Sequence, residues 1–110
     1  MQQITIKENS TIEIINAEQE SYTGYINYNT SRQGWFLDLV SENFSIYGIR
    51  ITTNPNILRQ WQKKLGFGIM VSCENNSEPF FWEDFNTGRA KIYLLEPDDL
   101  DFEDIIYAKI

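Results

Sequence analysis

The residues that could do chemistry in this chain are carboxylates, because it has no histidine and one cysteine, Cys73. The chain therefore lacks the commonest general base and metal ligand, and Ser-His-Asp and Cys-His catalytic arrangements are excluded. One cysteine without histidine also excludes the usual zinc sites and any intramolecular disulfide, so we interpret Cys73 as a small buried hydrophobe. The six glycines are scattered, and none forms a phosphate-binding loop before a helix. We expect no catalytic residues, no metal and no cofactor.

The nearest approach to a catalytic pair is Glu83 beside Asp84, directly after the aromatic run at residues 80–82. On a strand, adjacent side chains point to opposite faces, so these two carboxylates could not act together there. They are either turn carboxylates between two strands, which we favour, or part of an aromatic sugar-binding cleft of the glycosidase type. In the second case Trp82 would be the stacking platform.

The last fifteen residues are strongly acidic, with six carboxylates and one lysine. An EF-hand calcium loop counted from Asp99 would need glycine at its sixth position and a carboxylate at its twelfth. The chain has Asp104 and Ile110 at those positions, so the calcium interpretation fails. We predict a β-domain at residues 1–96 and an acidic C-terminal tail at residues 97–110.

Apolar and acidic residues interleave in this tail, and three interpretations are open. The tail could be a solvated acidic segment, it could fold back as an added strand or helical turn, or it could dock onto a basic, apolar groove of a partner. In the last case the contacts would come from Asp99, Phe102, Ile105 and Tyr107.

The net charge of −7 comes mostly from the tail, and the rest of the chain is nearly neutral. The basic cluster at Arg59, Lys63 and Lys64 is small, so we expect no nucleic-acid binding, which depends on clustered cations. No signal peptide and no run of about eighteen apolar residues is visible, so we expect no membrane partner and a reducing compartment.

Elements that would position these residues are mostly strands. Residues 22–53 alternate apolar and polar side chains in three runs, separated by turn clusters at residues 30–34 and 41–43. This pattern predicts three antiparallel strands joined by hairpins. In the second run Trp35 and Leu37 fall on one face, and Phe36 and Asp38 fall on the other.

Outside this meander, shorter strands are predicted at residues 3–7, 11–15, 67–73 and 89–95. Apolar residues at spacings of three and four predict a short helix within residues 56–66, ended by Gly66. The fold class is therefore all-β: a small antiparallel β-barrel or sandwich of six to eight strands with at most one short helix. Aromatic residues make up 15% of the chain, which indicates a core and an interface built on large flat groups. We expect Phe80, Phe81 and Trp82 to be mainly core, with at least one at a surface, since three consecutive side chains cannot all face inward.

The order of these elements resembles the plug proteins of contractile phage tail baseplates, a small family first described from a cyanophage. Four segments carry the likeness: the paired strands at residues 22–40 with Trp35-Phe36-Leu37-Asp38-Leu39, the Gly48-Ile49-Arg50-Ile51 strand, the connection from Asn56 to Gly66, and the closing Asp84-Phe85-Asn86-Thr87-Gly88-Arg89 that leads into Ile92-Tyr93-Leu94. The likeness covers roughly residues 3 to 95. It implies an all-β, non-enzymatic virion protein that sits in the hub at the tip of the tail tube and closes its lumen until contraction.

The resemblance implies baseplate hub and tail tube proteins as partners, with the tape-measure protein as a further candidate. It implies a location in the virion tail, after assembly in the host cytoplasm. The residues we expect to make contacts are Arg59, Lys63, Phe81 and Trp82, together with the four tail residues named above. Two other functions stay open: a small acidic phage-encoded inhibitor that mimics nucleic acid, and a carbohydrate-binding β-domain. The oligomeric state is open as well.

Overall fold

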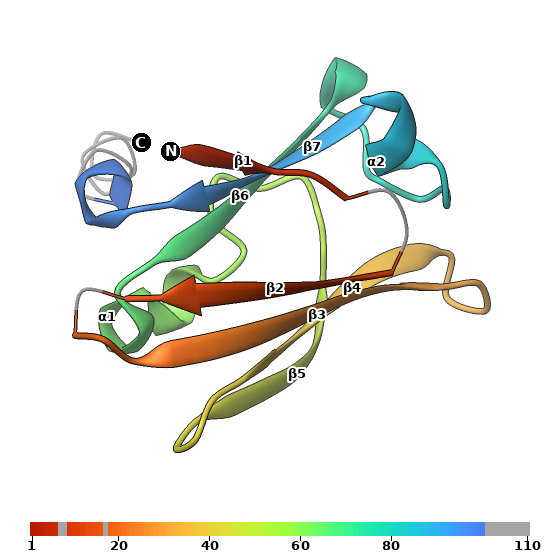
Figure 1. Cartoon of the computed structure of the whole chain (residues 1–110). Coiled ribbons are helices and arrows are strands. Elements are labelled where there is room, and N and C mark those ends of the chain that lie inside the picture. Colours follow the sequence, from red (N-terminus) through yellow and green to blue (C-terminus); the bar gives the residue numbers. More distant parts are fainter. Residues whose placement is uncertain (7–8, 17, 101–110) are drawn as a thin grey trace.

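Seven antiparallel strands form two sheets that face each other in the computed structural model, which describes residues 1–6, 9–16 and 18–100 (Figure 1). One sheet has the order β1-β7-β6, and the other has the order β2-β3-β4-β5. Their bounds are Gln2–Ile4 for β1, Ser10–Ile15 for β2, Ser21–Asn29 for β3, Gly34–Val40 for β4, Ser45–Arg50 for β5, Gly68–Cys73 for β6 and Ala90–Leu95 for β7. The all-β prediction is confirmed, and over the described residues the sheets form a sandwich and do not close into a barrel.

The helical segments are short. A 3₁₀ turn, η1 (Arg59–Trp61), runs into α1 (Gln62–Leu65), as predicted for the 56–66 connection. Gly66 ends α1 with φ of 76°, a left-handed conformation that glycine tolerates. A further 3₁₀ turn, η2 (Glu74–Asn76), follows β6, and a single helical turn, α2 (Asp84–Thr87), occupies the expected turn before β7.

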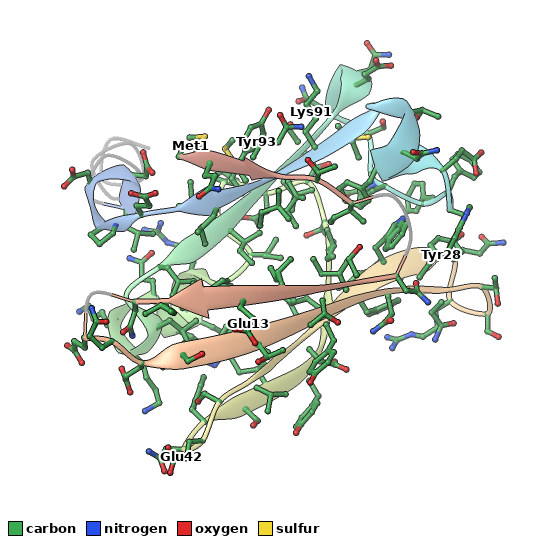
Figure 2. All side chains as sticks on the ribbon, in the orientation of Figure 1. Met1, Glu13, Tyr28, Glu42, Lys91 and Tyr93 are labelled. Atoms are coloured by element: carbon green, nitrogen blue, oxygen red, sulfur yellow. The ribbon has the colours of Figure 1, made fainter. Side chains whose placement is uncertain are left out.

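The core lies between the two sheets, where side chains fill the space (Figure 2). Along β4, Trp35, Leu37 and Leu39 are fully buried, as the period of two predicts. Each fully buried aliphatic side chain contributes about 1.5–3 kcal/mol relative to an exposed one. The other side chains under 2% exposed are Tyr22, Ile26, Ile51, Leu58, Leu65, Ile69, Val71, Ala90, Ile92 and Asn56. Cys73, expected to be buried, is half-buried and packs against this core.

The aspartate of the β4 motif fixes an irregularity between β4 and β5. Their register shifts between Leu37 and Leu39, which places a bulge opposite Asp38. The Gly48 N–H donates a hydrogen bond of 2.7 Å to Asp38 Oδ1, and Gly48 has φ of 70°. This carboxylate therefore holds a β-bulge that glycine accommodates.

The crossing from one sheet to the other depends on Asn56, whose side chain is buried. Its Oδ1 accepts hydrogen bonds from the N–H groups of Leu58 (2.9 Å) and Ile69 (3.0 Å). Its Nδ2 donates to Gln62 Oε1 at 3.0 Å. A Cβ at Gly68 would lie 2.6 Å from the Asn56 side chain, so the close approach of β6 requires glycine at that position.

Candidate functional site

Three consecutive aromatic residues project from the loop between β6 and α2 and form what we call the aromatic ridge: Phe80, Phe81 and Trp82. Their exposed fractions are 43%, 55% and 44%. The prediction that at least one of them lies at the surface is confirmed. The expectation that they are mainly core is wrong, because Trp35 from β4 already fills the core beneath them.

Ring stacking holds the ridge against the end of the β3–β4 hairpin. Trp82 stacks on the buried Trp35 with ring centroids 5.6 Å apart and planes 16° apart. Tyr28 packs edge-on against both indoles, at 5.4 Å from Trp35 and 5.8 Å from Trp82. Such aromatic pairs each contribute about 0.5–1.5 kcal/mol beyond the area they bury. Figure 2 shows Tyr28 at this end of the sandwich.

Two hydrogen bonds fix the backbone of the ridge to the same hairpin. The Tyr28 hydroxyl donates to the Phe80 carbonyl oxygen at 2.6 Å, and Trp35 Nε1 donates to the Phe81 carbonyl oxygen at 3.1 Å. With both carbonyls anchored to the hairpin, the exposed part of each ring is presented from a fixed loop. A partner binding here would lose little loop entropy, because the loop is already ordered.

The buried carboxylate of Asp84 also holds the backbone of the ridge in place. Its Oδ2 accepts a hydrogen bond from the Phe81 N–H and pairs with Arg89 Nη1, each at 2.8 Å. Arg89 also donates to the Glu78 carbonyl oxygen (3.1 Å) and to Ser77 Oγ (2.8 Å). Asp84 is therefore a structural carboxylate in the turn before β7, as the turn interpretation of this residue expected.

Basic and acidic residues predicted to make contacts lie elsewhere. Arg59 in η1 and Lys63 in α1 are at the opposite end of the sandwich from α2 (Figure 1). Asp99 follows β7, and its Oδ2 lies 2.7 Å from the amino group of Met1. That hydrogen bond raises the pKa of the Met1 amino group and lowers the pKa of Asp99.

The structure thus brings together Phe81 and Trp82 but does not join them to Arg59, Lys63 or Asp99. Phe102, Ile105 and Tyr107 lie outside the described residues.

Tyr28 and Trp35 are the residues that the sequence analysis missed as part of this site. Their alternation within β3 and β4 indicated core positions, and nothing local indicated that the Tyr28 hydroxyl and the Trp35 indole N–H bind residues 80 and 81. A tyrosine and a tryptophan at inward positions carry polar groups that need partners when buried. That requirement was the available signal.

Metal-ligating clusters and membrane-spanning helices are both absent from the described part of the chain. No group of three or more histidine, cysteine, aspartate or glutamate residues within it is placed to hold a metal ion. Among its helices, none is long and apolar enough to cross a membrane.

Comparison with known proteins gave one family match. The family described as cyanophage baseplate Pam3 plug gp18 matches residues 1–97 of this chain. No curated protein matches this chain.

Proposed function

The chain belongs to the cyanophage baseplate plug family, and from this premise we propose that it plugs the hub and tail tube in a contractile phage tail or a related injection system. Membership makes it a structural protein of the phage baseplate that interacts with other baseplate and tail proteins and is located in the virion tail. The finer proposal concerns its position in the lumen and the surface that holds it there.

The aromatic ridge is the observation that supports this role best. Three large rings, each roughly half exposed, stand on a loop that is anchored by two carbonyl hydrogen bonds and by the partly buried ion pair of Asp84 with Arg89. Aromatic residues are enriched in the cores of protein interfaces, and pre-ordered loops lose less entropy on binding. We propose that Phe81 and Trp82 are the principal contacts to the hub.

A plug must stay inert and stable, and the buried acidic group beside the ridge is consistent with that requirement. Asp84 is committed to the Phe81 N–H and Arg89, with its side chain 2% exposed. A carboxylate committed to an ion pair is poorly suited to act as a general acid or base. This arrangement supports a non-enzymatic role.

We propose further contacts at the small basic cluster and at the acidic C-terminal tail. Arg59 and Lys63 would meet an acidic surface, and Asp99, Phe102, Ile105 and Tyr107 of the tail at residues 97–110 would meet a basic one. We propose hub and tube proteins as the partners, with the tape-measure protein as a further candidate and the host cytoplasm as the place of assembly.

Co-expression with the hub and tube proteins of its own gene cluster tests the proposal. A plug should co-purify with them in a defined complex, and a chain lacking residues 97–110 should still fold and occupy the hub. If the full chain elutes alone in the presence of those proteins, the plug role is rejected. If removal of the tail abolishes all activity while the β-domain stays folded, the nucleic-acid mimic becomes the better account.

A further inference from the structure

Phe36 lies on the outer face of the four-stranded sheet, next to the inward-facing Trp35, and two arginines cover it. The guanidinium carbon of Arg32 is 4.3 Å from the centre of the Phe36 ring, and that of Arg50 is 5.3 Å from it. The ring is 9% exposed although it points away from the core, because these two side chains lie on it. We call these three residues the arginine face.

Arg50 is held in place by the turn between β3 and β4. Its Nη2 donates to the Gln33 carbonyl oxygen at 3.0 Å, and its Nη1 donates to the Arg32 carbonyl oxygen at 3.4 Å. A Cβ at Gly34 would lie 2.6 Å from Arg50 Nη2, so glycine leaves the space that this guanidinium occupies. The position of the charge is thus built into the hairpin.

Neither guanidinium is neutralised within the described part of the molecule. The ion pairs of Met1 with Asp99 and of Asp84 with Arg89 involve neither of them. The nearest acid along β4, Asp38, accepts a hydrogen bond from the Gly48 N–H.

Two exposed tyrosines lie near Asp38 on the same sheet. Tyr25 is the cross-strand partner of Asp38, and Tyr47 precedes the Gly48 that binds Asp38. They are 43% and 68% exposed. Tyrosine and arginine are the residues that most often dominate binding energy at interfaces.

We propose that the arginine face binds an acidic segment of another protein, with carboxylates paired to Arg32 and Arg50. A guanidinium offers five N–H donors in a planar fork that fits a carboxylate. Arg50 donates two hydrogen bonds to carbonyl oxygens, and the Arg32 guanidinium makes no hydrogen bond to the described residues. Two cations on a chain of net charge −7 are too few for a nucleic-acid backbone, so charge complementarity selects an acidic polypeptide. This surface lies on the outer side of the sheet and is independent of the hub-plug role.

A titration with a synthetic decaglutamate peptide tests the proposal, with decaglutamine as the uncharged control. In two-dimensional NMR, the amide signals of Gly34, Phe36 and Tyr47 should move with decaglutamate and stay unchanged with decaglutamine. Arg32→Gln should weaken the binding by about tenfold, as expected for the loss of one charge-assisted hydrogen-bonded pair. Its side chain is exposed and contacts the Phe36 ring, so the variant should fold.

Two further variants separate specific binding at the arginine face from a general effect of positive charge. Lys91→Gln removes the same charge from an exposed position on β7, in the other sheet (Figure 2), and should leave the affinity unchanged. Arg50→Lys keeps the charge but loses the fork, and should weaken binding. Equal loss of affinity in the Arg32→Gln and Lys91→Gln variants would overturn the proposal. So would binding of a DNA duplex that depends on Arg32, or a dimer of this chain that Arg32→Gln disrupts.

Discussion

Replacing Phe81 with alanine should weaken binding to the hub much more than it weakens the fold. The ring is 55% exposed. A phenylalanine buries about 150–250 Å² when fully covered, so a partner would cover roughly 100 Å² of this one. At about 25 cal/mol per Å², that area is worth about 2.5 kcal/mol, or roughly 70-fold in Kd.

The fold should tolerate this change because the bonds that anchor Phe81 come from its backbone. Its carbonyl oxygen accepts from Trp35 Nε1 and its N–H donates to Asp84, and both remain in the variant. We expect a loss of about 1–2 kcal/mol in the free energy of unfolding from the buried part of the ring.

Isothermal titration calorimetry against the purified hub protein measures the change in Kd, and urea denaturation measures the stability. Ile15→Ala is the matched control, since Ile15 is an apolar side chain 64% exposed on β2. If the Phe81 variant binds the hub as tightly as the Ile15 variant does, the aromatic ridge is not the contact surface and the reasoning is refuted.

Three other changes test the structural account by urea denaturation. Asp84→Asn should lower the free energy of unfolding by about 2–4 kcal/mol, because it leaves Arg89 without its buried partner; an unchanged midpoint would contradict that role. Gly68→Ala should lower it by about 1–3 kcal/mol, because the new Cβ would displace the Asn56 side chain; native stability would show that β6 can move away freely. Burial is the main cause that raises the pKa of Tyr22 above its usual 10.0, and two neighbouring glutamates raise it further. The fold therefore favours the neutral phenol. Stability should fall as the pH rises above about 10 through the raised pKa, and less so in Tyr22→Phe; identical pH profiles would exclude this contribution.

Much of the fold followed from the sequence because its strongest signals are local. The alternation in residues 22–53 assigned β3, β4 and β5, and it placed Trp35 and Leu37 inward. Asp38 could be recognised as part of a motif, but its bond to Gly48 required the bulge between β4 and β5. A register shift of this kind depends on pairing between strands and is not visible in either strand alone.

The candidate site was harder to predict because it joins segments far apart in the chain. The ridge at residues 80–82 looks apolar enough to be core, and its exposure depends on Trp35 occupying the space below it. The arginine face likewise brings Arg32 from a turn and Arg50 from β5 over Phe36. Neither arrangement has a local signature, since each needs the three-dimensional register of the sheet.

Cryo-electron microscopy of the extended and contracted tails tests the central claim most directly. We predict density for this two-sheet domain within the lumen at the tip of the tube in extended tails, with the aromatic ridge against the hub, and its loss from the lumen after contraction. Density for the chain on the outer surface of the baseplate, or an open lumen in extended tails that contain the protein, would contradict the plug assignment.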